Sequence, residues 1–138
     1  MGYKKILILL FVGTLLANVD QYISLINEFS INNKFEDAAK TFKKAVIEYD
    51  SSAELYYFGA QISIKMDDLD QANKHFVKAI ELDKKNEVYR NAQKKLSELR
   101  SGLTNAKKTL DFGNIDAAIV EYKKLSTTFS ESAMVFYK

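Results

Sequence analysis

Hydrophobic residues recur at intervals of three and four over most of the chain from residue 20 onward, with polar residues between them. This spacing places the hydrophobic side chains on one face of a helix. Ser52 is suited to cap one of these helices, because a serine hydroxyl accepts a hydrogen bond from the first helical turn. The chain has no proline and only five glycines, which favours continuous helix. We therefore predict an all-α fold with helices over residues 20–31, 35–49, 53–66 and 69–82.

The same pattern occurs three times. Ala72, Phe76 and Ala79 lie on one stripe of a helix, and the small residues at its ends let a neighbouring helix approach closely. The residues 34 positions earlier match this stripe without a gap: Ala38, Phe42 and Ala45. A third copy follows after 46 positions and contains Ile115, Ala118, Tyr122 and Leu125. We therefore divide the chain into repeats at about 19–52, 53–86 and 87–132, followed by the start of a truncated fourth repeat at 133–138.

These residues resemble the tetratricopeptide repeat (TPR), a 34-residue helix–turn–helix with the pattern W-x2-L-G-x2-Y, then A-x3-F, then proline. Tyr56 stands at the tryptophan position and Ala60 at the glycine position, whereas Ser63 replaces the second aromatic residue and Lys84 the proline. The resemblance implies antiparallel helical hairpins stacked as a right-handed α-solenoid over residues 18–138. It also implies a concave surface, lined by the first helix of each repeat, that holds an extended or helical peptide.

The resemblance places a set of mixed apolar and polar residues in this groove: Ile23, Asn27, Ile31, Tyr57, Gln61, Ile64, Lys65, Leu103 and Lys107. Family members that clamp the carboxylate end of chaperones use basic residues and asparagine here. Asn27 fits that set, but Ile23 and Phe58 occupy places where the clamp needs polar groups, so we do not carry the clamp over. The mixed groove suits a protein or peptide segment with apolar anchors and some acidic character.

Residues 87–112 form the least regular part of the pattern. Their apolar residues follow a coiled-coil type of seam, which predicts one long helix of about 26 residues. The alternative is a break at Ser101-Gly102, since glycine destabilises a helix interior by about 1 kcal/mol relative to alanine. An unbroken helix would overhang its neighbours by roughly 18 Å at 1.5 Å per residue. The seam consists of Val88, Ala92, Leu96, Leu99, Leu103, Ala106 and Leu110.

Residues 1–17 differ in character from the rest. A short basic start, MGYKK, precedes 12 residues without a charge, which is typical of a secretory signal peptide ending at Ala17. An uncleaved N-terminal anchor and a buried first helix are the alternatives. We expect export to a bacterial periplasm, or tethering to the membrane that faces it. Without residues 1–17 the chain has equal numbers of acidic and basic residues, so a globally basic nucleic-acid binder is not indicated.

Candidate chemistry is sparse. His75 is the one histidine of the sequence and falls one residue off the buried stripe, which indicates a partly exposed surface position. Asp67, Asp68 and Asp70 lack the glycine and distal glutamate of a calcium loop, and turn formation and helix capping explain them more simply. We therefore predict no catalytic residues, no metal site, no cofactor and no enzymatic activity.

Three classes of function fit these patterns. The first is a non-enzymatic scaffold for protein–protein interaction in an exported or envelope-associated assembly. The second is a membrane-surface protein that uses the N-terminal segment together with residues 84–108, which contain eight basic and two acidic residues. A solvated helix face is the simpler explanation of those charges. The third is a helical accessory domain of a longer enzyme. We also expect self-association through the Val88–Leu110 seam or the apolar residues 134–137.

Overall fold

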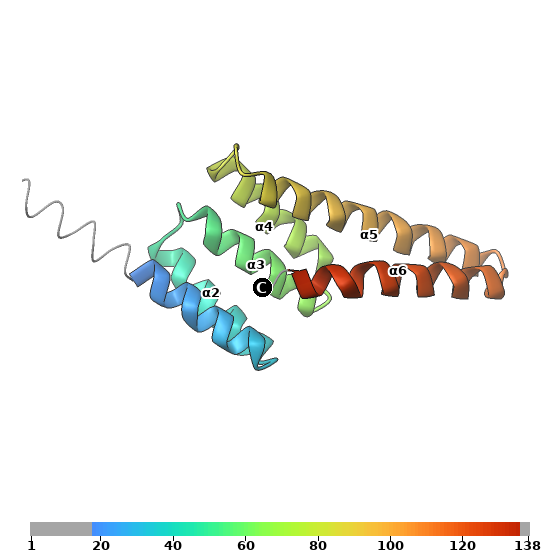
Figure 1. Cartoon of the computed structure of the whole chain (residues 1–138), viewed down its shortest axis with the longest axis horizontal. Helices are drawn as coiled ribbons and strands as arrows, with labels where there is room; N and C mark the ends of the chain where they lie inside the picture. Colours follow the sequence, from blue (N-terminus) through green and yellow to red (C-terminus); the bar gives the residue numbers. More distant parts are fainter. Residues whose placement is uncertain (1–17, 136–138) are drawn as a thin grey trace, which may run out of the picture. The chain divides into compact units, whose positions relative to one another are not determined.

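The structure is a computed structural model in which residues 18–135 are described, with side chains as far as residue 129. Within these residues the chain forms helices only, which confirms the predicted all-α fold (Figure 1). The chain divides into two compact units, Met1–Lys85 and Asn86–Lys138. Each unit is described by itself.

The helices recur with the period expected from the sequence. Unit 1 contains a helix over residues 18–31, followed by α2 (Phe35–Glu48), α3 (Ala53–Lys65) and α4 (Leu69–Leu82). The 18–31 helix ends 34 positions before the end of α3. The start and the end of α2 also lie 34 positions before those of α4. Unit 2 is a hairpin of α5 (Glu87–Asp111) and α6 (Ile115–Val135). The end of α5 lies 46 positions after the end of α3, and the start of α6 lies 46 positions after the start of α4.

The same turn closes all three hairpins. Asn33, Asp67 and Gly113 occupy equivalent positions with φ angles of 56°, 60° and 82°. In each hairpin the next backbone N–H donates to the carbonyl oxygen five residues earlier, as from Lys34 to Phe29 at 2.8 Å. This arrangement satisfies the last carbonyl groups of the preceding helix and turns the chain into the next one. The left-handed conformation favours asparagine, aspartate and glycine, and these are the residues present.

Hydrogen bonds to side chains cap the starts of α3 and α5. The Ser52 Oγ accepts a hydrogen bond from the Leu55 N–H at 3.3 Å, which confirms the predicted cap of α3. At the equivalent position of the next repeat, the Asn86 side chain accepts from the Val88 N–H at 3.0 Å and caps α5. Each such bond satisfies one of the four free N–H groups at a helix start and is worth about 1 kcal/mol.

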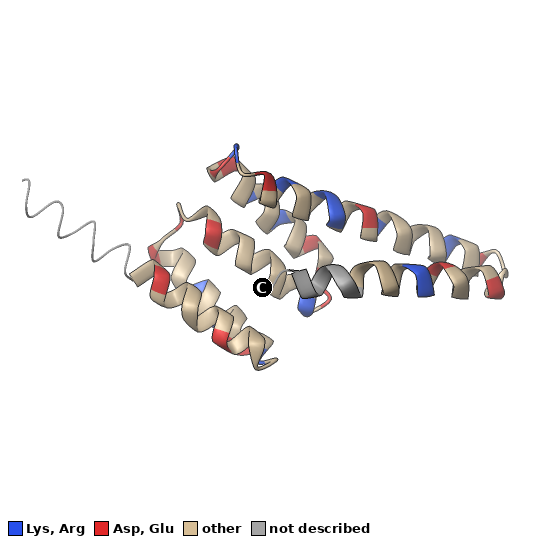
Figure 2. Cartoon of the chain, in the orientation of Figure 1, with Lys and Arg blue, Asp and Glu red and all other residues tan. Residues whose placement is uncertain are grey.

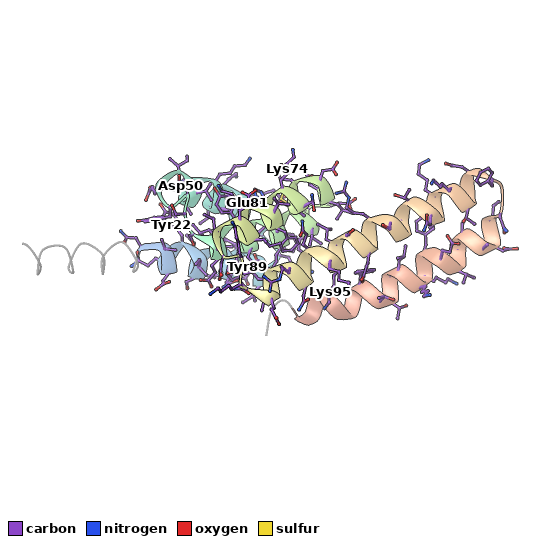
Figure 3. All side chains as sticks on the ribbon, turned by 90° about the horizontal axis from the view of Figure 1, so that it is seen from above. Tyr22, Asp50, Lys74, Glu81, Tyr89 and Lys95 are labelled. Carbon is purple, nitrogen blue, oxygen red and sulfur yellow. The ribbon has the colours of Figure 1, made fainter. Side chains whose placement is uncertain are left out.

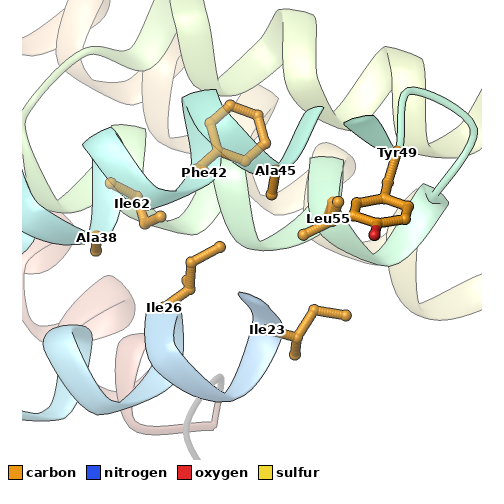
Figure 4. Packing of buried hydrophobic residues seen from close by; sticks show 8 residues of the cluster. All are labelled: Ile23, Ile26, Ala38, Phe42, Ala45, Tyr49, Leu55 and Ile62. Carbon is orange, nitrogen blue, oxygen red and sulfur yellow. The ribbon is translucent and has the colours of Figure 1, made fainter. Parts of the chain in front are cut away.

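The core of unit 1 is built around the predicted stripes. Ala38, Phe42 and Ala45 of α2 are buried, and they pack with residues of the 18–31 helix and α3 (Figure 4). On α4 the equivalent stripe is fully buried, and α4 packs along α3. The alanines let the helices approach, while the phenylalanine rings fill the space between them. The remaining members of the cluster in Figure 4 are Ile23, Ile26, Tyr49, Leu55 and Ile62.

Gly59 of α3 has a packing role, because the Phe42 ring lies against it. A Cβ atom at residue 59 would stand 2.5 Å from the Phe42 Cζ and 2.6 Å from its Cε2, closer than carbon atoms pack. The ring also meets Tyr56 and His75 edge-on, with centroids 6.0 and 4.8 Å away. A phenylalanine on α2, a glycine on α3 and a histidine on α4 thus join three helices at one point.

Unit 2 confirms the long helix. α5 is continuous through Ser101-Gly102, and Gly102 faces α6, where it accommodates Leu125. A Cβ atom at residue 102 would stand 2.4 Å from the Leu125 Cδ2. The glycine therefore marks a close helix–helix contact rather than the break that was the alternative.

Several residues of unit 2 are more exposed than the pattern predicted. Val88, the first residue of the predicted seam, is 58% exposed, and the buried residue at that end is its neighbour Tyr89. In the third copy Ala118 is buried, but Ile115 and Tyr122 are exposed. Within unit 2 each helix has a single partner helix, so each can bury only one side of its apolar face. The spacing of apolar residues in the sequence predicts which face of a helix is apolar, but not how many neighbouring helices cover that face.

The expected start of a fourth repeat is also different. The sequence pattern predicts that the third repeat ends at about residue 132 and that a fourth repeat starts at residue 133. Instead, α6 runs without a turn from Ile115 to Val135. The predicted signal segment, residues 1–17, and the last residues, 136–138, lie outside the described residues.

Candidate functional site

The predicted groove residues of unit 1 come from two helices and differ in accessibility. On the 18–31 helix, Ile23 is 9% exposed and belongs to the core, so it is not available to a ligand, whereas Ile31 is 69% exposed. Asn27 is half-buried. On α3, Tyr57 and Ile64 are half-buried and Lys65 is exposed. The predicted set in this unit therefore combines apolar surface with access to solvent at most of its positions.

Gln61 is the most unusual residue of this set. It lies on α3 between Tyr57 and Lys65, one helical turn from each, yet it is only 3% exposed. Both polar atoms of its amide, Oε1 and Nε2, are buried without a hydrogen-bond partner. A buried amide without partners destabilises a fold by about 1–3 kcal/mol, so such groups are rare in native structures. The sequence pattern placed Gln61 on this face but gave no sign of its burial.

Tyr57 is held in place by other rings. Its centroid lies 5.9 Å from that of Phe76, the buried phenylalanine of α4, and 5.9 Å from that of Phe58. These contacts fix the ring at the edge of the core while leaving part of it exposed. Tyr57 can therefore offer a rigid apolar surface next to the Gln61 amide.

His75 is partly exposed, as the sequence pattern predicted, and its ring also takes part in the packing. Its ring contacts the Phe42 ring edge-on, and its Nε2 lies 3.2 Å from the Gln71 Nε2. Because an amide nitrogen can only donate, the His75 Nε2 accepts this bond, which requires the neutral ring. Burial lowers the pKa of His75, the neighbouring Lys74 adds to this effect, and Asp68 opposes it. The one-residue offset from the buried stripe predicted this partial exposure but gave no sign of the ring contact with Phe42.

Each unit contains a shallow cleft. In unit 1 a cleft of about 350 Å³ lies between the 18–31 helix and the end of α2, where the Tyr22 hydroxyl donates to the Glu48 carboxylate at 3.3 Å. Partial burial and this carboxylate raise the pKa of Tyr22. In unit 2 a cleft of about 340 Å³ lies between α5 and α6 and is lined by both apolar and charged side chains, including Leu125, Glu98 and Lys124. These volumes are at the lower end of those of ligand pockets.

The remaining groove residues, Leu103 and Lys107, lie on α5. Leu103 is half-buried, and the Lys107 Nζ donates to the Asp111 carboxylate at 3.0 Å, which raises the pKa of Lys107. Figure 2 shows that acidic and basic positions are interspersed along α5 and α6. Arg90, one of the basic residues in the 84–108 segment, lies 4.0 Å from Glu87.

Two kinds of site are absent from the residues that the structure describes. No group of three or more histidine, cysteine, aspartate or glutamate side chains in this part of the chain is arranged to hold a metal ion. None of the helices in the same residues is both long and apolar enough to cross a membrane.

Comparison with known proteins gives no further guide to this surface. A scan against models of protein families finds no match to the chain, and a search of curated proteins finds no similar sequence.

Proposed function

We propose that this chain is a non-enzymatic scaffold of tetratricopeptide type that binds a segment of a partner protein on the α3 face of unit 1. The observation that carries the proposal is the unpaired amide of Gln61, which stands between a ring-anchored Tyr57 and the exposed Lys65. A primary amide offers both a donor and an acceptor, which match the N–H and C=O of an extended peptide.

The repeated architecture supports the family assignment. Three hairpins close with the same left-handed turn, and the helix ends in unit 1 recur with the period of the sequence repeat. This period and the two-helix unit are those of tetratricopeptide repeats, which stack as right-handed solenoids. We extend the proposal to that stacking.

The chemistry of the face supports a peptide ligand with apolar and acidic groups. Ile31 and Ile64 provide apolar surface, and Lys65 provides a positive charge. Because Gln61 is buried in the free protein, the proposal requires that the groups covering its amide move aside when the peptide binds. The Gln61 amide, which is unpaired in the free protein, then forms two hydrogen bonds with the peptide, and these bonds favour the bound state.

A peptide-display selection on the full chain tests this proposal. We expect selected peptides to bind the Gln61→Leu variant about tenfold more weakly, a loss of about 1.4 kcal/mol, because the amide can no longer pair with the peptide backbone. The same variant should unfold at an equal or higher temperature, since leucine removes a buried polar group that has no partner. Lys65→Glu should also weaken binding of acidic peptides.

The matched control is Ile47→Gln, which changes an isoleucine of α2 that is exposed and outside the proposed face. This variant should bind the selected peptides like the unmodified chain. Equal binding by the Gln61→Leu, Lys65→Glu and Ile47→Gln variants would mean that the α3 face is not the site.

The second candidate function, binding to a membrane surface, rests on the excess of basic residues in segment 84–108. Flotation of the full chain with vesicles containing anionic lipid, at low and high salt, separates the two proposals. Binding through these side chains should fade as salt screens the charges. We further propose export to a bacterial periplasm or tethering at its membrane, and N-terminal sequencing of soluble and membrane fractions tests whether cleavage follows Ala17.

A further inference from the structure

The α5–α6 hairpin leaves one apolar face uncovered near its turn. Ile115, Ile119 and Tyr122 are all exposed, and their spacing of four and three places them on one stripe of α6. On α5, Leu103, Lys107 and Leu110 form a second stripe with the same spacing. The hydrogen bond to Asp111 is the main cause of the raised pKa of Lys107. Tyr122 of α6 lies near enough to this lysine to make a smaller contribution in the same direction. The two stripes therefore border each other on one face of the hairpin, whose side chains are drawn in Figure 3.

The level of each residue along the hairpin is fixed by contacts across it. The Thr109 hydroxyl of α5 donates to the Glu121 carboxylate of α6 at 3.2 Å, and Leu125 occupies the space beside Gly102. Residue 109 is therefore level with about residue 120 on the antiparallel partner helix. Leu110 and Ile119 stand side by side near the middle of the apolar face.

Charged residues flank this face in a self-complementary order. On the α5 side, Lys107 and Asp111 lie one helical turn apart, with residue 109 midway between them. On the α6 side, Asp116 and Lys123 lie two turns apart, and their midpoint falls beside Ile119. Both midpoints are at the same level of the hairpin. A single two-fold axis through that level, lying in the plane of the face and perpendicular to the helices, places acid opposite base on both sides at once.

We propose that this face binds a second copy of the chain, with the two hairpins packed antiparallel about Ile119 to form a four-helix arrangement. In this dimer Ile119 meets Ile119 of the second copy. Lys107 lies opposite Asp111 of the second copy, and Asp116 lies opposite Lys123. Two-helix hairpins with an uncovered apolar face bury it efficiently in this way, and a two-fold interface requires the self-complementary charges found here. The interface is separate from the proposed peptide-binding face on α3.

Cysteine crosslinking of the full chain tests the geometry, since the natural sequence contains no cysteine. Ile119→Cys should form a disulfide-linked dimer on oxidation, because the axis brings the two residues together. Val120→Cys is the matched control: it is the next residue along, on a different side of α6 and more exposed than Ile119, at 66% against 46%. The control should form no disulfide-linked dimer under the same conditions. Equal crosslinking of both variants, or of neither, would overturn the proposal.

A charge swap tests the pairing independently of any cysteine. Asp116→Lys and Lys123→Asp should each weaken the dimer by roughly threefold to tenfold in sedimentation, because like charges then face each other across the axis. The double variant should return to within about twofold of the unmodified chain. Residues 116 and 123 are two turns apart within one copy, so restoration can arise only between copies. An unmodified chain that is monomeric at micromolar concentration, or a double variant weaker than either single one, would contradict the proposed dimer.

Discussion

Gly59→Ala is the substitution for which helix propensity and packing predict opposite effects. In an exposed helix interior this change stabilises a protein by up to about 1 kcal/mol, because alanine restricts the unfolded chain. In this structure the new methyl group would stand 2.5 and 2.6 Å from two carbon atoms of the Phe42 ring. Carbon atoms pack at roughly 3.5–4.0 Å, so the ring would have to retreat by about 1 Å.

The size of the stability loss depends on the displacement of the Phe42 ring. Phe42 is also packed against Tyr56 and His75, so its displacement disturbs three helices at once. Overpacking of this kind destabilises a core by about 1–3 kcal/mol. After subtraction of the propensity gain, we expect Gly59→Ala to lower the free energy of unfolding by about 0.5–2 kcal/mol. Urea denaturation of the full chain, followed by circular dichroism at helical wavelengths, measures this change.

A double-mutant cycle separates the ring contact from any other effect of the methyl group. In a Phe42→Leu background the smaller side chain leaves room, so the same Gly59→Ala change should become neutral or stabilising. The two changes should therefore be coupled by at least about 1 kcal/mol. A Gly59→Ala protein that is more stable than the unmodified chain in both backgrounds would refute the reasoning, because propensity alone would then be sufficient.

Three further predictions follow from the packing. Phe76→Ala should lower the free energy of unfolding by about 3–5 kcal/mol, since the ring is fully buried, whereas the exposed neighbour Val77→Ala should cost less than about 1 kcal/mol in the same urea experiment. Gly102→Ala should destabilise unit 2 rather than strengthen α5, because its methyl group would meet Leu125; a gain in thermal stability would contradict the observed contact. His75 has a pKa below its usual value of 6.5, so its stabilising contribution is present above pH 6.5 and is lost as the pH falls below that value. Urea midpoints on either side of pH 6.5 should show a smaller acid loss for His75→Gln than for the unmodified chain.

The helices and their period could be predicted because their determinants are local. Helix bounds depend on caps and turn residues within a few positions, and the sequence shows these directly at Ser52, Asn33 and Asp67. The burial of the alanine–phenylalanine stripes follows from spacing alone in unit 1. A single long α5 was also predicted, because its apolar seam continues on both sides of Gly102.

What could not be predicted depends on contacts between residues far apart in the chain. The motif gave no reason for a glycine at residue 59, whereas the structure shows that its physical reason is the Phe42 ring on the preceding helix. The exposure of Val88 and the burial of Tyr89 depend on which side of α5 is covered, and the spacing of apolar residues does not specify that side. The candidate site shows the same limit: spacing placed Gln61 on the α3 face but could not show that its amide is buried and unpaired.

The length of the third hairpin has a rotational consequence for α5. Two of its buried residues, Tyr89 and Leu96, follow the buried residues Leu55 and Ile62 of α3 by 34 positions, so the start of α5 repeats the phase of burial in α3. Gly102, which contacts α6, instead follows Tyr56 by 46 positions, and Tyr56 contacts His75 on α4, the second helix of its own hairpin.

The 12 additional residues amount to about three and one third helical turns at 3.6 residues per turn. The two phases therefore differ by about a third of a turn. The added length does more than extend α5: it swings the side on which the returning helix packs by about 120° relative to the side that it would occupy in a hairpin of ordinary length. An insertion of about 11 residues, close to three whole turns, would nearly have kept the original direction. Removal of a single residue from the middle of α5 should therefore bring the side of α5 that packs on α6 most of the way back to the phase of the start of the helix.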